Sequence, residues 1–243
     1  MSLLKSIIRK AIISAGYSIQ KNGVLSGDPA SMAAALQRLR QWEIRPEIII
    51  DLGAAQGTWT EKALMVWPDA RYELVEPLAE QRNRLENLKS KHSGINYHLA
   101  VAGEASGEVF LNVAPDLDGS GVYGTQSGDN VRKVPVITID EMVKGIEGNI
   151  LIKFDTHGYE VPILKGTTEA LKRTSALIIE VYGFPISPTC LLFQELSSYL
   201  DGLGFRLIDM VDIMRRPGDH AFWQADAVYL RKDNPVFQKN SYA

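Results

Sequence analysis

Cysteine is almost absent from this sequence, because Cys190 is the only one among 243 residues. An internal disulfide is therefore excluded, and a reducing compartment is expected. The sequence also lacks any uninterrupted run of about 18 apolar residues, the length that a membrane-spanning helix needs. These two absences predict a cytoplasmic protein.

An excess of basic residues is missing as well, since 26 lysines and arginines accompany 29 aspartates and glutamates, for a formal net charge of −3. Proteins that bind nucleic acid usually carry a basic surface stripe, so DNA and RNA are not expected as partners. The 45% hydrophobic and 23% charged residues are ordinary for a single globular chain.

Acidic residues are absent before Asp28, where the sequence begins "MSLLKSIIRKAIISAGYS". The apolar residues of positions 1–18 repeat at helical spacing, and Lys5, Arg9 and Lys10 lie between them. The pattern predicts an amphipathic basic helix. It favours packing on the same chain or on a second copy in a homo-oligomer, and weak contact with an anionic membrane surface is the alternative.

Apolar bursts and helical patterns alternate from residue 31 onward. Strands are expected at 47–53, 71–77, 95–103, 107–114, 133–140, 149–155, 176–182, 205–214 and 225–232. Helices are expected at 31–42, 58–67, 78–92, 161–174 and 190–204. Several strands are apolar on successive residues, which is typical of strands covered on both faces.

This alternation predicts a Rossmann-like α/β fold with a doubly wound, mostly parallel sheet of seven strands. The last two strands follow each other without a helix, so an antiparallel pair is expected at one edge. A helical arm at residues 1–45 would precede a single domain at 46–243.

A glycine-containing turn, "DLGAAQG", ends the first of these strands. Ligands of doubly wound sheets bind at the carboxyl ends of the strands, and Gly53 and Gly57 would let the backbone approach one closely. The next helix is expected to start near Thr58, whose hydroxyl can cap it. Glu76 ends the second strand and is placed to accept hydrogen bonds from ribose hydroxyls.

Two nucleotide-like cofactors compete for this site. A dinucleotide fingerprint, G-x-G-x-x-G, needs one more glycine than the turn contains. Asp51, two residues before the turn, would repel a phosphate but could orient an ammonium group. S-adenosylmethionine is therefore predicted, with a dinucleotide or a fold that binds neither as alternatives. The predicted cofactor-binding residues are Asp51, Gly53, Ala54, Gly57, Thr58, Glu76, Pro77, Ala100 and Asp155.

A second polar cluster follows the strand at 149–155, in "NILIKFDTHGYEVPILKG". An acid, a hydroxyl, an imidazole and a second acid occur within six positions. Gly158 is expected to adopt a positive φ, and Thr156 is expected to cap the helix that follows. Part of the cluster is therefore turn chemistry, and part is available for a reaction.

The ordered motifs "IIIDLGAAQGTWT", "YELVEP", "LAVAGEASGEVFLNV", "VPVITIDEM" and "ILIKFDTHGYEVPILKG" resemble the FkbM family of S-adenosylmethionine-dependent O-methyltransferases. The similarity runs from Glu47 to Arg231. Members typically methylate hydroxyls of sugars, polyketides and related metabolites, so the resemblance implies such an acceptor.

The family's fourth-strand motif reads I-K-I-D-x-E-G-x-E, and Lys153, Asp155, Gly158 and Glu160 match it in register. His157 stands where the family usually has its first Glu. The resemblance therefore leaves the role of His157 open.

Methyl transfer to an alcohol needs an acceptor for the hydroxyl proton, because a protonated alcohol is a poor nucleophile. His157 is the natural candidate, since an imidazole is largely neutral at pH 7. Asp155 could orient that imidazole or take the proton itself, and a reaction driven by proximity alone needs neither. Glu160 and Lys153 are expected to form a supporting ion pair.

Three further points concern the acceptor and a metal. Asp155 and Glu180 end neighbouring strands and could hold Mg²⁺, although a metal-free site is favoured. Trp223, between the last two strands, could stack on a sugar. The predicted substrate residues are Lys153, Glu160, Glu180 and Trp223.

These patterns together predict an O-methyltransferase that acts on a small metabolite or a glycan, with a sugar as the first choice. An N- or carboxyl-methyltransferase on the same fold is one alternative. A non-catalytic module that retains the fold is another.

Overall fold

The structure is a computed structural model that describes residues 18–20, 23–25, 28–124, 126–239 and 241. The basic helix predicted for positions 1–18 lies outside these residues except for Ser18. No helix in these ranges is long and apolar enough to cross a membrane.

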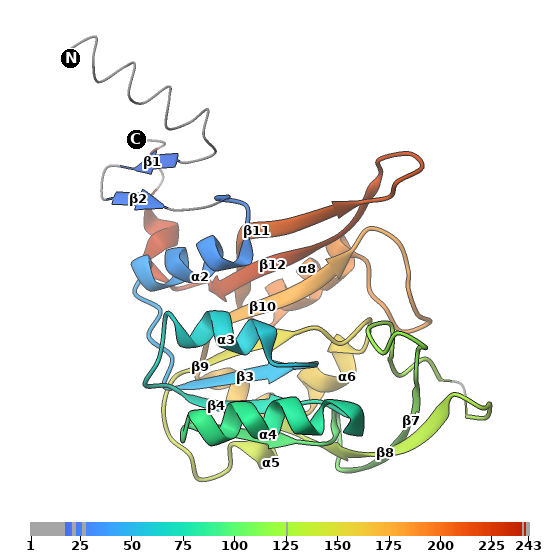
Figure 1. Ribbon diagram of the computed structural model, residues 1–243. Coiled ribbons are helices and arrows are strands. Elements are labelled where there is room, and N and C mark those ends of the chain that lie inside the picture. The colour runs from blue at the N-terminus through green and yellow to red at the C-terminus, as the bar shows by residue number, and fades with distance from the viewer. Residues whose placement is uncertain (1–17, 21–22, 26–27, 125, 240, 242–243) are drawn as a thin grey trace.

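A seven-stranded sheet with the order β11-β12-β10-β9-β3-β4-β5 forms the centre of the molecule (Figure 1). Its strands are β3 (Ile48–Leu52), β4 (Arg71–Val75), β5 (Ile95–His98), β9 (Ile150–Phe154), β10 (Thr174–Tyr182), β11 (Phe205–Arg215) and β12 (Phe222–Arg231). The strands from β10 to β5 are parallel, whereas β12 pairs antiparallel with both β10 and β11. The predicted doubly wound sheet and its antiparallel edge pair are confirmed.

Helices cover both faces of this sheet. They are α2 (Met32–Gln41), α3 (Thr58–Leu64), α4 (Arg82–Lys91), α5 (Ile139–Met142), α6 (Glu160–Lys165), α7 (Thr168–Lys172) and α8 (Phe193–Gly202), with short 3₁₀ turns η1 (Ala79–Gln81) and η2 (Pro235–Gln238). Helices α2, α3 and α4 pack on one face, and α5 to α8 pack on the other. The long helix predicted at 161–174 is two helices, separated by Gly166 and Thr167.

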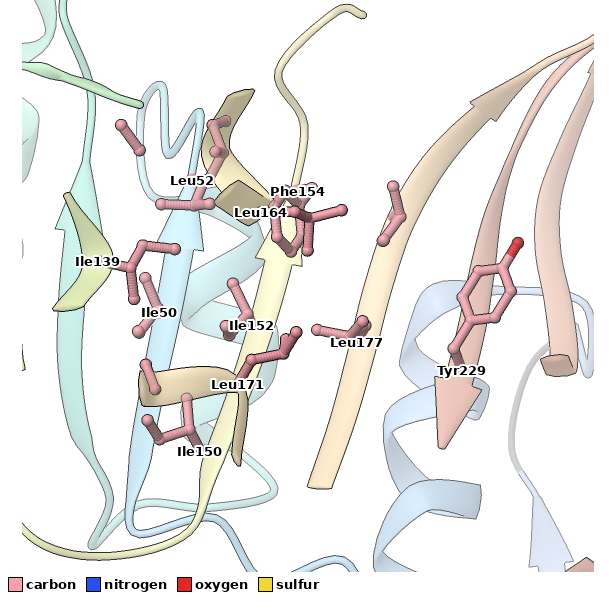
Figure 2. Packing of buried hydrophobic residues seen from close by; sticks show 14 of the residues in the cluster. Ile50, Leu52, Ile139, Ile150, Ile152, Phe154, Leu164, Leu171, Leu177 and Tyr229 are labelled. Atoms are coloured by element: carbon pink, nitrogen blue, oxygen red, sulfur yellow. The ribbon is translucent and has the colours of Figure 1, made fainter. Parts of the chain in front are cut away.

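Side-chain alternation along the strands divides the core into these two layers. Ile150, Ile152 and Phe154 of β9 point toward α5 to α8, as Figure 2 shows, while Leu151 packs with α2 to α4. Each strand is apolar on successive residues because both of its faces are buried. The same alternation fixes which polar side chains of β3 and β9 meet.

A small three-stranded sheet with the order β6-β8-β7 lies beyond the main sheet. Its strands are β6 (Val101–Ala102), β7 (Gly107–Asn112) and β8 (Val131–Ile137), and a separate hairpin joins β1 (Ser18–Gln20) and β2 (Gly23–Leu25). The loop between β7 and β8 turns back at a bridge from Asn112 to Gly121. The strands predicted at 107–114 and 133–140 therefore form a layer of their own.

Two predicted helix caps are wrong. Helix α3 begins at Thr58, but the residue before it, Gly57, occupies the cap position with φ of 79°. Helix α6 begins at Glu160, and the Thr156 hydroxyl donates to the Glu160 carboxylate at 3.0 Å and does not cap the backbone. Both turns use the left-handed backbone of a glycine where the sequence suggested a hydroxyl.

Candidate active site

The chain reverses direction within the sheet between β3 and β9. From β3 it runs outward to β4 and β5, and it then returns to β9 on the other side of β3. Such switch points leave a crevice at the carboxyl ends of the strands. A cavity of about 310 Å³ lies there, between the strand ends and the β7–β8 loop.

Glu76 forms one end of this cavity, directly after β4. Its Oε2 accepts the Ala55 N–H at 2.8 Å, and its Oε1 accepts the Leu78 N–H at 2.8 Å. Burial raises the pKa of the carboxyl, and the two amides partly offset that effect. A carboxylate has about four lone-pair sites, so each oxygen can accept one more hydrogen bond from a ligand hydroxyl.

The two glycines of the β3–α3 turn are required by the backbone and by packing. Gly53 and Gly57 have φ of 71° and 79°, the left-handed region that favours glycine. A Cβ on Gly53 would lie 2.0 Å from the Asp155 carbonyl oxygen, and one on Gly57 would lie 2.7 Å from Leu88. Gly53 lines the cavity but Gly57 does not, so the closeness of a ligand explains neither glycine by itself.

Asp51 is fully buried on the α3 side of the sheet and does not line the cavity. The Thr60 hydroxyl donates to Asp51 Oδ2 at 2.6 Å, while Oδ1 has no hydrogen-bond partner among the described residues. Burial raises the pKa of Asp51, and Lys153 partly offsets this. The structure thus places Asp51 beneath the site, so direct contact with a ligand ammonium has no support in its geometry.

The predicted ion pair between Lys153 and Glu160 is wrong. Asp51 and Lys153 are register partners on β3 and β9, so both side chains point to the same face. Lys153 Nζ lies 2.8 Å from Asp155 Oδ2 and 3.7 Å from Asp51 Oδ1, and its side chain is only 5% exposed. Glu160 lies on α6, on the opposite face, where it accepts the Gly158 N–H.

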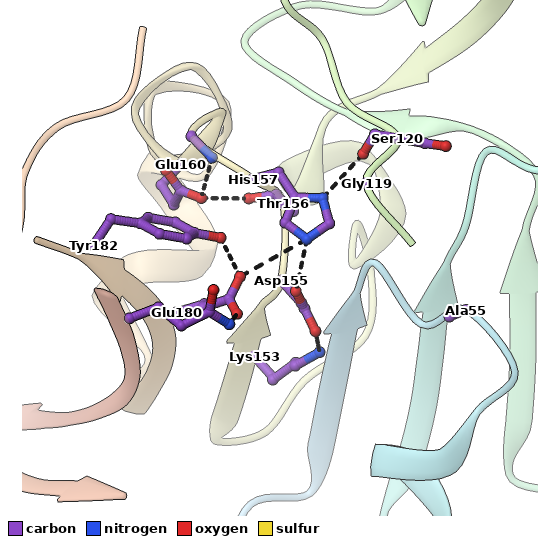
Figure 3. A network of polar contacts seen from close by, with 12 residues as sticks. Ala55, Gly119, Ser120, Lys153, Asp155, Thr156, His157, Glu160, Glu180 and Tyr182 are labelled. Atoms are coloured by element: carbon purple, nitrogen blue, oxygen red, sulfur yellow. Dashed lines mark hydrogen bonds and ion pairs between the residues drawn. The ribbon is translucent and has the colours of Figure 1, made fainter. Parts of the chain in front are cut away.

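The other end of the cavity combines Asp155, His157 and Glu180, as Figure 3 shows. His157 Nε2 lies 3.5 Å from Asp155 Oδ1 and 3.8 Å from Glu180 Oε2. His157 Nδ1 lies 3.0 Å from the Ser120 carbonyl oxygen, which only accepts, so Nδ1 carries a proton. In the neutral ring, Nε2 therefore presents a lone pair to the two carboxylates.

The backbone holds His157 in an uncommon conformation. Its φ is 50°, and the next residue, Gly158, has the predicted positive φ of 89°. A left-handed conformation costs a residue with a side chain about 1–2 kcal/mol, and such strain often occurs at functional sites. Ala55 at the other end of the cavity is also left-handed, with φ of 44°.

Asp155 and Glu180 have opposite electrostatic surroundings. Burial alone would raise the pKa of Asp155, but Lys153 holds it below its usual value. Burial and the nearby negative charge of Asp155 raise the pKa of Glu180 to about 7. Tyr182 and Gln224 both donate hydrogen bonds to the Glu180 carboxylate.

The cavity brings together some of the predicted site residues and leaves others elsewhere. Those that line it are Gly53, Glu76, Pro77, Ala100, Asp155, His157 and Glu180. Those that do not are Asp51, Ala54, Gly57, Thr58, Lys153, Glu160 and Trp223. Trp223 instead stacks on Phe184, with ring centroids 5.9 Å apart.

Sequence reasoning missed several residues of this site. Ala55, Leu78, Gln81, Ser120 and Gly121 line the cavity, and Gln224 and Tyr182 bind Glu180. The β7–β8 loop had a composition typical of a flexible loop over a site, but nothing in it marked the Ser120 carbonyl. Contacts made by backbone atoms leave little signal in a sequence.

The cavity wall has a clear charge character. Glu76, Asp118, Asp155 and Glu180 line it, and none of its described wall residues is a lysine or an arginine. A phosphate would therefore have no cationic partner there, whereas a ligand with a positive charge is favoured. These residues fit the cationic cofactor S-adenosylmethionine better than a dinucleotide.

Comparisons with known proteins agree with this geometry. Residues 51–207 match the Methyltransferase FkbM domain. A crystal structure of methyltransferase FkbM from Methylobacillus flagellatus KT has a TM-score of 0.50 and 19% identity, and the match covers 75% of this chain and 42% of that one. A precorrin-6y C5,15-methyltransferase from Geobacter metallireducens GS-15 has a TM-score of 0.44 and 11% identity, over 86% and 90% of the two chains.

No curated protein matches the chain. The chain spans less than half the length of the Methylobacillus protein, whose likeness shows the fold. The domain match is more extensive, since it covers more than half of the sequence and contains both ends of the cavity, Glu76 and Glu180. The motif resemblance is thereby confirmed, and this chain belongs to the FkbM methyltransferase family.

Proposed function

We propose that this protein transfers a methyl group from S-adenosylmethionine to a hydroxyl of a small metabolite or glycan, with a sugar as the first choice. One observation carries the proposal: a single cavity joins Glu76 to the proton-accepting atoms of Asp155, His157 and Glu180. The first end suits a nucleoside, and the second suits a group that must lose a proton.

Glu76 would hold the ribose hydroxyls of the cofactor. Its two backbone hydrogen bonds fix the carboxylate before any ligand binds, so little side-chain entropy remains to be lost. The acidic wall favours the positive charge of the sulfonium. When bound, S-adenosylmethionine supplies an electrophilic methyl group, which leaves sulfur as the acceptor oxygen bonds to the carbon.

The cluster of Asp155, His157 and Glu180 would receive the hydroxyl proton. Its atoms that face one another are the imidazole Nε2 and two carboxylate oxygens, and all three are acceptors. Ser120 fixes the ring tautomer, so that Nε2 is the nitrogen that faces the carboxylates. A base positioned in this way typically contributes about 10²–10⁴-fold to a rate.

The charge of the cluster also ranks the alternatives. A carboxylate acceptor would be repelled by Asp155 and Glu180, so carboxyl methylation is disfavoured. An amine can donate a proton to the same atoms and is the second candidate acceptor. A sugar hydroxyl is preferred because the FkbM resemblance implies one, and because Trp223 lies next to Gln224, a ligand of Glu180 in the hydrogen-bond network.

Calorimetric titration with S-adenosylmethionine and with S-adenosylhomocysteine tests the cofactor. We expect both to bind, because both contain the ribose that Glu76 would hold. Binding of neither would overturn the enzyme proposal and support a non-catalytic module.

A transfer assay with labelled methyl donor, run against sugars, glycans and polyketides and followed by mass spectrometry, tests the acceptor. His157→Ala should bind the cofactor normally but turn over about 10²–10⁴-fold more slowly. His220→Ala is the matched control, because His220 also has a left-handed φ of 57° but is exposed on the β11–β12 hairpin. Full activity of His157→Ala at every pH would remove His157 from the reaction.

A further inference from the structure

Three lone pairs converge at the reactive end of the cavity without a proton donor between them. His157 Nε2, Asp155 Oδ1 and Glu180 Oε2 all lie within 4.8 Å of one another. The separations of 3.5 and 3.8 Å from Nε2 exceed the roughly 2.7–3.2 Å of a nitrogen–oxygen hydrogen bond. By contrast, Nδ1 on the same ring makes a normal hydrogen bond of 3.0 Å.

Acceptor atoms that face one another repel unless a positive species lies between them. Ligand atoms bound to one ion at about 2.0–2.2 Å are themselves separated by about 3 Å or more. The observed separations are therefore closer to those of ligands around an ion than to those of hydrogen-bond partners.

We propose that Asp155, His157 and Glu180 form a binding site for a divalent cation, with Mn²⁺ as the best match among first-row metals. One imidazole nitrogen and two carboxylate oxygens suit Mn²⁺ better than Mg²⁺, which prefers oxygen ligands alone. The sequence suggested Asp155 and Glu180 with Mg²⁺; the fold adds His157 and with it a nitrogen ligand.

Each of the three ligands is oriented by a residue outside the cluster. Ser120 accepts from the far nitrogen of His157, Lys153 donates to the far oxygen of Asp155, and Tyr182 and Gln224 donate to Glu180. Histidine ligands of metals almost always donate their other N–H in this way, often to a backbone carbonyl, and ligating carboxylates are also hydrogen-bonded. The cluster has this outer shell already in place (Figure 3).

The position of the cluster leaves room for the other ligands of a metal. Its three residues lie on the wall of the 310 Å³ cavity, so waters and an acceptor hydroxyl can complete the coordination. This inference rests on the proposed function, and it specifies how the hydroxyl is activated. A coordinated hydroxyl loses its proton more readily, and the proton can pass to solvent while Nε2 stays bound to the cation.

Titration of the full-length, chelator-treated protein with Mn²⁺ alone tests the site, with the electron paramagnetic resonance signal of free Mn²⁺ as readout. We expect a single class of sites. His157→Asn should weaken binding by at least about tenfold, since even the loss of an outer partner of a metal ligand costs 10–100-fold. Asparagine tolerates a left-handed backbone, so this variant keeps the turn, and His220→Asn is the control that should bind Mn²⁺ normally.

The outcomes separate this inference from the proposed function. If wild-type protein binds no Mn²⁺, or if His157→Asn binds it as tightly, the metal site is wrong. Methyl transfer that persists in chelator would leave the proposed function intact with His157 as the proton acceptor. If Mn²⁺ binds through His157 but no acceptor is methylated with or without it, the metal site stands and the proposed function fails.

Discussion

The two ends of the cavity treat buried negative charge in opposite ways. At the nucleoside end, both oxygens of Glu76 accept backbone N–H groups. At the reactive end, the outward atoms of Asp155, His157 and Glu180 are satisfied, but the atoms that face one another have no donor between them in the described part of the chain. The first end is complete before a ligand binds, whereas the second needs a positive species.

Removal of Lys153 should break the reactive end most severely. Lys153→Met leaves Asp51 and Asp155 without their cation, and Asp51 is fully buried. Loss of one partner from a buried ion pair typically costs about 3–5 kcal/mol, so denaturant unfolding should shift to much lower concentrations. Failure to fold would agree with this expectation.

Lys232→Met is the control for this variant. Lys232 pairs with Asp201 on the surface, where both side chains are largely exposed. Exposed pairs contribute little, so its unfolding curve should match that of the wild type. Equal stability of Lys153→Met and Lys232→Met would show that the acids beneath the cavity do not need Lys153.

A methyl group at Gly53 should disturb the point where the two ends meet. Gly53→Ala forces a side chain into a left-handed backbone and to within 2.0 Å of the Asp155 carbonyl. The two effects together cost about 2–5 kcal/mol and should also displace Asp155 and slow turnover. Thermal unfolding and steady-state kinetics measure them.

Gly145→Ala separates the two contributions. Gly145 has φ of 75°, but a Cβ there meets nothing within 4 Å. Only the conformational cost applies, so this variant should lose stability modestly and keep its turnover. If both variants behaved alike, the close contact between Gly53 and Asp155 would have no energetic consequence.

The nucleoside end should respond in ligand affinity more than in stability. Glu76→Ala removes the acceptor proposed for the ribose hydroxyls, and charge-assisted hydrogen bonds of this kind contribute about 1.5–3 kcal/mol. The dissociation constant for S-adenosylmethionine should therefore rise about 10–100-fold in calorimetry. Glu80→Ala, a nearby surface glutamate that pairs with Arg132, should bind normally. Unchanged affinity of Glu76→Ala would place the ribose elsewhere.

The sequence predicted the fold well because its signals are strong and local. Isoleucine-rich strands such as 48–52 and 150–154, which alternate with helices, specify a parallel sheet covered on both faces. The antiparallel edge followed from two strands without a helix between them. The separate β6-β8-β7 sheet was not predicted, because strand patterns do not state which sheet a strand joins.

The site was only partly predictable, for a physical reason. Residues at strand ends, such as Glu76 and Asp155, were found because parallel strands bring their carboxyl ends to one edge. The partner of Lys153 was assigned wrongly, since it depends on the register of β3 against β9. The tautomer of His157 depends on the Ser120 carbonyl, a backbone group that any residue would provide.

Asp226, on the strand beside Glu180, offers the finest test of how much negative charge the reactive end tolerates. Burial raises the pKa of Asp226 from 3.8 to about 6, with Lys153 partly offsetting the effect. The folded protein thus holds this proton more tightly than the unfolded chain, so the contribution of Asp226 to stability falls as pH rises from about 4 to 6. Above that window the deficit is constant.

Asp226→Asn should therefore be more stable than the wild type at pH 7, by about 1–3 kcal/mol, and should lose that advantage below pH 4. Denaturant unfolding at a series of pH values measures both effects. The same variant should weaken Mn²⁺ binding slightly, because one negative charge near the cluster is gone. A variant that is less stable at pH 7, with an unchanged pH slope, would mean that the Asp226 carboxylate has a cationic partner strong enough to outweigh its burial.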